Sequence, residues 1–289
     1  TVDIEILLDI QRRSFGVNSS ALDWFHSYLS DRSQVVSIGS DAYGPSTVEC
    51  GVPQGSIIGP TGFVVYTEEL AESIAEPSIT FNQYADDTAM LSHIPLADVP
   101  ARRTIIEHSL VAVRDWFQSR RLQLNADKTE LIWFGTKSNL GKVHTLDTVV
   151  TFENISIRPV PSVKYLGVQL DSELNMHRQV NSIAASCFFQ LRRVRQLRNV
   201  IGPVAMQRVV SALILSRLDY CNAILIGLPV STLAPLQRVQ NAAARLVAGI
   251  GPRDSITSTL RHLHWLPVHL RRLHFHLLQL KTQRSTYFT

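Results

Sequence analysis

Two adjacent acidic residues, Asp86 and Asp87, are of a type and spacing that suggest chemistry. They lie between two short stretches with the pattern of β-strands, residues 79–84 and 89–91, so the sequence predicts a β-hairpin with both carboxylates at its tip. Adjacent carboxylates repel each other, and a bound divalent cation would offset that repulsion. Asp-Asp is also a common turn dipeptide, because Asp side chains bond the nearby backbone. The pair alone leaves both interpretations open.

A second candidate is the loop formed by residues 51–60, which contains three glycines and two prolines. It leads directly into an expected helix that extends to about residue 74. Free backbone N–H groups at such a helix entry attract phosphate or sugar groups. Taken alone, the loop also fits an ordinary turn.

Charge is distributed unevenly along the 289 residues. Residues 178–289 contain 15 Lys and Arg against two acidic residues, whereas residues 1–177 contain 13 against 22. This asymmetry predicts one part that binds metal ions and another that holds a polyanion. A helical domain with ordinary solvated arginine faces is the alternative.

Composition excludes several other classes of protein. The chain has no apolar run long enough for a transmembrane helix, so no membrane partner is expected. Its three cysteines are widely spaced, which argues against a disulfide framework or a zinc site. No secretory signal pattern is found, and a secreted protein is not expected.

The elements that position these residues change character near residue 175. Before it, helices and strands are mixed. Helices are expected over residues 5–15, 19–29 and 98–121, strands over 34–38, 47–50, 131–134, 148–157 and 163–170, and a Gly/Pro loop over 39–45. After it, apolar residues recur at helical spacing in three stripes: Val180, Ile183, Cys187, Leu191 and Val194; Val209, Leu213 and Leu218; and Leu236, Val239, Ala243 and Leu246. A last helix is expected from Pro267 to about Lys281.

The order of these segments resembles the reverse transcriptases of non-LTR (LINE-type) retrotransposons. The matching stretches are TVDIEILL, ALDWFHSYLSDRSQVV, GVPQGSIIGP, YADDTAML, LQLNADKTELIWFG, VKYLGVQLD and, in the tail, LHWLPVHLRR. The resemblance covers nearly the whole chain. It implies the α+β fold of a right-hand polymerase. Residues 1–172 would form part of the fingers and the palm, an antiparallel sheet with packed helices, and residues 173–289 a basic, all-helical thumb-like domain and C-terminal region.

The resemblance also implies an RNA-directed DNA polymerase, whose partners are an RNA template, a DNA primer and deoxynucleoside triphosphates. Asp86 and Asp87 match the Tyr-x-Asp-Asp motif, which holds two Mg²⁺ ions, with Mn²⁺ as an alternative. Asp86 would be the direct ligand and Asp87 its support. Lys128 matches a lysine that donates a proton to the departing pyrophosphate; a solvated loop lysine is the alternative.

Further site residues follow from the same resemblance. The implied nucleotide- and template-binding residues are Pro53, Gln54, Gly55 and Tyr84; the primer grip is Tyr165, Leu166 and Gly167; and the nucleic-acid backbone would be held by Arg192, Arg193, Arg195 and Arg198. A plain sheet strand is the alternative for the primer grip. Histidines also gather near the C-terminus, where a neutral face or an RNA contact is favoured over a metal site because no Cys accompanies them: His262, His264, His269, His274 and His276.

The palm of this family also uses an aspartate from a strand that would precede Thr1. Asp3 belongs to the segment after that strand and is not expected to bind metal, and Ile4 stands where the family usually has His. We therefore expect a longer parent polypeptide, in a retroelement ribonucleoprotein of the nucleus or cytoplasm, and no activity from these residues alone. The alternatives are a catalytically dead nucleic-acid-binding remnant, a host or intron-type polymerase, and an RNA-copying RNA polymerase with the same palm.

Overall fold

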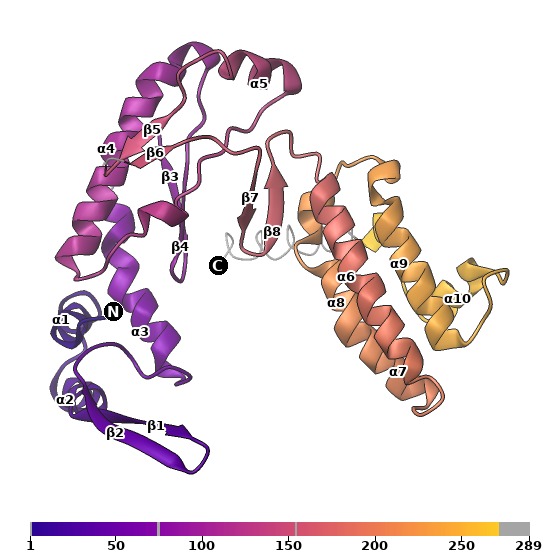
Figure 1. Ribbon diagram of the computed structural model, residues 1–289, viewed down its shortest axis with the longest axis horizontal. Coiled ribbons are helices and arrows are strands. Elements are labelled where there is room, and N and C mark those ends of the chain that lie inside the picture. The colour runs from indigo at the N-terminus through magenta and orange to yellow at the C-terminus, as the bar shows by residue number, and fades with distance from the viewer. Residues whose placement is uncertain (1, 74–75, 154, 272–289) are drawn as a thin grey trace. The chain divides into compact units, whose positions relative to one another are not determined.

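The computed structural model describes residues 2–73, 76–153 and 155–271, which divide between two compact units (Figure 1). Unit 1 consists of Thr1–Leu131 and Lys137–Val160, and unit 2 of Ile132–Thr136 and Pro161–Thr289. Both contain helices and strands, so the expected α+β class is confirmed. The last residue of unit 1 is Val160, so the hairpin of residues 162–171 belongs to unit 2. The expected boundary between the palm and thumb parts lies later, after residue 172.

Unit 1 alternates helices with hairpins, and its strands form separate two-stranded antiparallel pairs. Its elements are α1 (Ile4–Ser14), α2 (Ser19–Leu29), β1 (Arg32–Ile38), β2 (Asp41–Val48), α3 (Ile58–Thr67), the 3-10 helix η1 (Glu68–Ser73), β3 (Thr80–Tyr84), β4 (Asp87–Leu91), η2 (Leu96–Asp98), α4 (Val99–Ser119), η3 (Ala126–Lys128), α5 (Lys137–Val143), β5 (Val150–Phe152) and β6 (Ile155–Ile157). Asp3 begins α1 by accepting a hydrogen bond from the Ile6 N–H.

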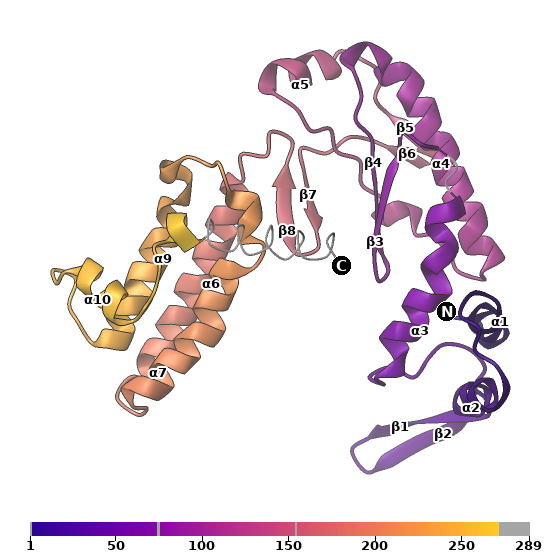
Figure 2. The ribbon, with the colours of Figure 1, turned by 180° about the vertical axis from the view of Figure 1, so that it is seen from behind.

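Unit 2 starts with one hairpin and continues as helices. Its elements are β7 (Ser162–Tyr165), β8 (Val168–Asp171), α6 (His177–Gln196), α7 (Pro203–Val210), the π-helical turn η4 (Ser211–Leu215), α8 (Ser216–Asp219), η5 (Asn222–Leu225), α9 (Val230–Ala248) and α10 (Ile256–His262). Figure 2 shows α6, α7 and α9 from behind, and these helices pack on one another. None of the helices in residues 2–271, apart from the undescribed gaps, is both long and apolar enough to cross a membrane.

The core of unit 2 confirms most of the predicted apolar stripes. Cys187 on α6, Leu236 on α9 and Ile214 on η4 are fully buried. Leu213 is the exception, because it is exposed while Ile214 and Leu215 are buried. The π-helical turn inserts a wider turn at Ser211–Leu215, so the buried face no longer follows the 3.6-residue period assumed from the sequence. The expected helix after Pro267 is described only as far as residue 271; the rest lies outside the described residues.

Several expected strands are hairpins or are shorter than expected. Residues 148–157 fold into the β5–β6 hairpin, and residues 163–170 into the β7–β8 hairpin. The stretch 131–134 forms only an isolated bridge between Leu131 and Pro159. The expected loop over 39–45 is shorter in the structure, because β2 already begins at Asp41. Pro45 lies within β2, where the pairing register shifts opposite Gln34–Val36, and such a β-bulge can accommodate a proline.

Candidate active site

The acidic pair lies at the tip of the predicted hairpin, which the structure confirms. Tyr84 on β3 pairs with Asp87 on β4, and Ala85 and Asp86 form the two-residue turn between them. Ala85 has a φ of 53°, a left-handed conformation that costs a non-glycine residue about 1–2 kcal/mol. The Gln83 side-chain amide donates a hydrogen bond of 3.2 Å to the Ala85 carbonyl and stabilises this turn. Strained turns of this kind concentrate at functional sites.

Both carboxylates face solvent, as does the ring of Tyr84. Neither Asp86 nor Asp87 accepts a hydrogen bond or ion pair from another described residue. Free carboxylate oxygens are the hard ligands that Mg²⁺ and Mn²⁺ prefer, so this donor pair fits a divalent cation. In the described part of the chain, no group of three or more His, Cys, Asp or Glu side chains is arranged to hold a metal ion.

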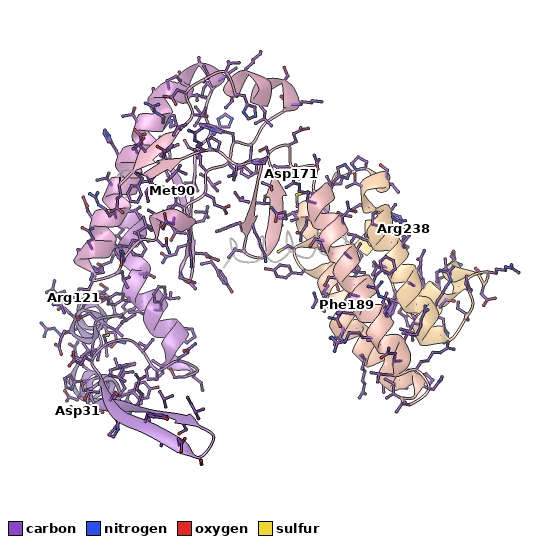
Figure 3. All side chains as sticks on the ribbon, in the orientation of Figure 1. Asp31, Met90, Arg121, Asp171, Phe189 and Arg238 are labelled. Atoms are coloured by element: carbon purple, nitrogen blue, oxygen red, sulfur yellow. The ribbon has the colours of Figure 1, made fainter. Side chains whose placement is uncertain are left out.

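One hydrophobic cluster joins the acidic hairpin to the segment that carries Lys128. Met90 of β4, labelled in Figure 3, packs against the cluster that contains Leu110 of α4 and Ala126 of η3. Lys128 is two residues beyond Ala126, and its N–H donates 3.2 Å to the Asn125 carbonyl. Its side chain is exposed. The acidic strand and the Lys128 turn are thus anchored on the same core of unit 1.

The Gly-rich loop is held at both ends and open in the middle. The Gly51 N–H donates 2.7 Å to the Val2 carbonyl, and the Gly59 N–H donates 2.9 Å to the Ser56 hydroxyl. Gly55, between them, has a φ of 80°, and a Cβ placed there would meet nothing within 4 Å. Gly55 is therefore needed for its backbone conformation, and the space beside it is open to a ligand. Pro53 is half-buried and Gln54 is exposed.

A buried tyrosine that the sequence analysis did not single out ties three segments of unit 1 together. The Tyr66 hydroxyl on α3 donates 2.5 Å to the Arg120 carbonyl after α4 and accepts 3.2 Å from the Asp3 N–H before α1. The Asp3 carboxylate in turn pairs with Arg121 at 2.5 Å. Burial raises the pKa of Tyr66 above its ordinary value of 10.0. The hydrogen bond with the Asp3 backbone lowers this pKa, but by less than burial raises it.

The expected primer-grip residues form the turn of the β7–β8 hairpin in unit 2. Tyr165 pairs with Val168, and Leu166 and Gly167 between them both have positive φ, 46° and 81°. Positive φ at both central residues is the pattern of a type I′ turn, which matches the twist of the flanking strands. Glycine adopts this conformation freely, whereas Leu166 does so at a cost of about 1–2 kcal/mol.

The four expected backbone-binding arginines are all exposed on or just after α6. Val194, which lies between them in the sequence, is buried in the core of unit 2. The guanidinium of Arg193 lies 5.8 Å from the centre of the Phe189 ring, which is half-exposed. Within the described residues, no carboxylate neutralises the four: Arg192, Arg193, Arg195 and Arg198.

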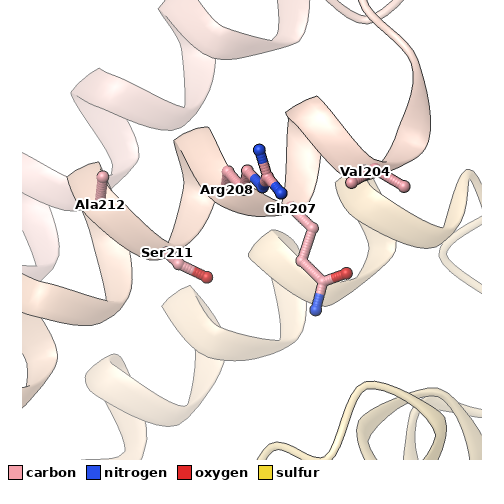
Figure 4. Close-up of a pocket in the computed structure, with 5 residues that line it drawn as sticks. All are labelled: Val204, Gln207, Arg208, Ser211 and Ala212. Atoms are coloured by element: carbon pink, nitrogen blue, oxygen red, sulfur yellow. The ribbon is translucent and has the colours of Figure 1, made fainter.

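The C-terminal histidines fall partly outside the described residues, which include His262, His264 and His269 but neither His274 nor His276. A shallow open depression of about 580 Å³ lies on α7 and η4, lined by Val204, Gln207, Arg208, Ser211 and Ala212 (Figure 4). It belongs to unit 2, and it contains none of the residues expected to carry chemistry.

Comparison with known proteins gives a consistent result. A family model described as reverse transcriptase (RNA-dependent DNA polymerase) matches residues 1–170. The probable RNA-directed DNA polymerase from transposon BS of Drosophila melanogaster is 28% identical over 178 residues, which cover 60% of this chain and 19% of that protein. The RNA-directed DNA polymerase from mobile element jockey is 26% identical over 162 residues in Drosophila melanogaster, covering 54% and 17%.

The jockey polymerase of Drosophila funebris is 30% identical over 146 residues, covering 48% of this chain and 15% of that protein. The chain thus spans less than a fifth of the length of each of these relatives. The family match covers more than half of the chain, and the relatives all come from mobile elements. The chain belongs to the reverse transcriptase family, among the enzymes of non-LTR, LINE-type retrotransposons.

Proposed function

We propose that this chain supplies the palm carboxylates and the thumb of an RNA-directed DNA polymerase. The observation that carries the proposal is the acidic hairpin, in which Asp86 and Asp87 are exposed, have no partner among the described residues and lie on a strained turn. It occurs inside the stretch that matches the reverse transcriptase model. Reverse transcriptases generally use divalent metal ions, and Asp86 and Asp87 would hold Mg²⁺ here, with Mn²⁺ as a substitute.

The reaction is transfer of a nucleotide to the primer. The primer 3′-hydroxyl loses its proton to solvent, and its oxygen attacks the α-phosphorus of a deoxynucleoside triphosphate. The bond from that phosphorus to the oxygen that bridges it to the β-phosphorus breaks, and pyrophosphate leaves. Bound Mg²⁺ would lower the pKa of the attacking hydroxyl and stabilise charge on the departing phosphates. Lys128 would donate a proton to the departing pyrophosphate, and its exposed side chain on a short turn leaves it free to do so.

Other residues would position the substrates. The open space beside Gly55 lets the incoming nucleotide and the template base approach the loop of Pro53 and Gln54, and the exposed Tyr84 ring offers a stacking surface next to the carboxylates. The primer terminus would contact the turn of Tyr165, Leu166 and Gly167. The exposed arginines on α6 would meet phosphates of the template–primer duplex without reading its sequence.

Primer extension on an RNA template in a longer polypeptide of the same element tests the catalytic roles. Asp86→Asn should abolish extension, because an amide cannot supply the anionic ligand, while Asp41→Asn on the exposed β2 strand should leave the rate unchanged. Asp87→Asn should reduce extension less than Asp86→Asn does. Extension by the Asp86 variant at the wild-type rate would refute the assignment.

We also propose that these 289 residues do not extend a primer on their own. Two metal ions are usually shared among more carboxylates than the pair at Asp86 and Asp87, and no larger ligand group exists among the described residues. Robust Mg²⁺-dependent synthesis by the isolated chain would contradict this.

The proposed location is a ribonucleoprotein of the nucleus or cytoplasm.

The second candidate function is nucleic-acid binding without catalysis. The exposed arginines on and just after α6 favour it, because no carboxylate of the described residues pairs with them and they would act independently of the acidic hairpin. If the chain has this function, it should bind an RNA–DNA duplex with an affinity that decreases as salt increases. The longer polypeptide should then fail to extend a primer, even when every carboxylate is intact.

A further inference from the structure

The β7–β8 hairpin is built into the helical part of unit 2. The Asp171 carboxylate at the end of β8 accepts 2.9 Å from the Asn175 N–H and 2.8 Å from the Met176 N–H, just before α6 (Figure 3). The buried Gln179 of α6 accepts 2.9 Å from the Gln169 N–H of β8. These bonds fix the open end and the edge of the hairpin, but they do not reach its turn.

The turn itself is held by Tyr220, which follows α8. Its hydroxyl donates a hydrogen bond of 2.6 Å to the Leu166 carbonyl. Its ring covers Gly167, because a Cβ at that glycine would lie 3.6 Å from a ring carbon of Tyr220. A residue 54 positions away in the sequence therefore contacts both central residues of the turn.

The position of Tyr220 is itself well defined. Its N–H donates 3.0 Å to the carbonyl of Ser216, the first residue of α8. The preceding residue, Asp219, forms a two-bond ion pair with Arg271, and both side chains are largely buried. The following residue, Cys221, has a φ of 52° and redirects the chain. Tyr220 thus connects α8 to the turn, through its N–H at one end and its hydroxyl at the other.

We propose that Tyr220 is a positioning residue that holds the Leu166–Gly167 turn in the conformation that receives the primer terminus. The inference rests on the proposed function of this turn and adds to it a residue from the helical part of the chain. Leu166 adopts a left-handed conformation that its side chain disfavours. A hydrogen bond to the carbonyl of that residue stabilises the turn in this form. About half of the surface of Tyr220 remains exposed.

The test uses the whole 289-residue chain and a DNA primer whose 3′-terminal base carries a photoreactive thio group, annealed to an RNA template. Crosslinked peptides that contain residues 162–171 report contact with the turn, and fluorescence anisotropy reports total binding. Tyr220→Phe removes one hydroxyl and keeps the ring. It should lower the crosslink yield at the hairpin about 5-fold, the size expected for one hydrogen bond, while the Kd for the duplex stays within about 2-fold.

Tyr43→Phe is the matched control, because Tyr43 is an exposed tyrosine on β2 of unit 1. It should change neither the crosslink yield nor the Kd. Hydrogen exchange supplies an independent readout: in Tyr220→Phe the amides of residues 165–168 should exchange faster than in the wild type, with α6 unchanged.

The outcomes separate the inference from the function on which it rests. Faster exchange at the turn with an unaltered crosslink yield would overturn the positioning role and leave the proposed function standing. Unaltered exchange would overturn the contact itself. If the wild-type chain bound the primed duplex no better than single-stranded RNA and gave no crosslink at residues 162–171, the proposed function would fail first and the primer-positioning role with it.

Discussion

The Tyr66 hydroxyl offers the most direct test of how unit 1 is held together. It is nearly inaccessible to solvent and bridges Arg120 and Asp3, which lie after α4 and before α1. In Tyr66→Phe the Arg120 carbonyl and the Asp3 N–H both lose a partner, and each such loss costs about 0.5–1.5 kcal/mol. The expected decrease in the free energy of unfolding is therefore about 1–3 kcal/mol, without a cavity, because the ring is retained.

Urea denaturation combined with hydrogen exchange measures this loss and locates it. Faster exchange should appear in peptides from α1 and from the end of α4, while peptides from α6 and α9 in unit 2 should serve as an internal control. Tyr43→Phe, at an exposed position of the same unit, should change stability by less than about 0.5 kcal/mol. Equal stability of Tyr66→Phe and Tyr43→Phe would refute the bridging role.

The pH dependence of the same variant has a definite sign. Burial raises the pKa of Tyr66 in the folded state, so its contribution to stability is fully present below the ordinary value of 10.0 and is lost as pH rises through the raised pKa. Phenylalanine does not ionise. The free-energy difference between wild type and Tyr66→Phe should therefore be smaller at pH 11 than at pH 8, and a difference that grew with pH would contradict this.

Three further predictions concern single residues. Burial raises the pKa of the Cys187 thiol to about 11. At pH 8 a thiol reagent should therefore label the exposed Cys50 and Cys221 and reach Cys187 only in urea. The contribution of the neutral Cys187 thiol to the free energy of unfolding should be fully present below pH 9 and should decrease toward pH 11. Asp171→Asn should lower stability by about 1–2 kcal/mol in urea denaturation, since an amide can accept only one of the two N–H bonds before α6. Gly55→Ala should cost about 1–2 kcal/mol from its positive φ alone, an effect absent from an exposed alanine substitution elsewhere.

Local patterns in the sequence were enough to predict much of the fold. The stripe from Val180 to Val194 repeats at helical spacing and is buried in α6, apart from the partly buried Ile183. The acidic hairpin was also predictable, since polar and apolar residues alternate on one side of Asp86 and Asp87. Both patterns depend on neighbours within a few residues, which is the range over which periodicity is informative.

Contacts between residues far apart in the sequence, and turns without a recognisable turn sequence, were not predictable. The turn at Leu166 lies between apolar residues and has no Asn-Gly or Asp-Gly signal, so the hairpin was expected to be one strand. The contact of Tyr220 with that turn spans 54 positions, and the contact of Tyr66 with Arg120 spans the same number. Nothing within either local segment indicates the partner.

Neither compact unit is a continuous stretch of sequence, and this affects how the chain can fold as it is synthesised. Residues 132–136 belong to unit 2, where the Gly135 N–H donates 3.0 Å to the Ser172 carbonyl, yet residues 137–160 return to unit 1. On the ribosome, the 132–136 segment emerges well before its partner at residue 172 and must wait while unit 1 is completed around it. Residues 132–136 include Trp133 and Phe134, so a nascent chain paused between residues 136 and 172 would expose apolar surface and be a preferred target for chaperones.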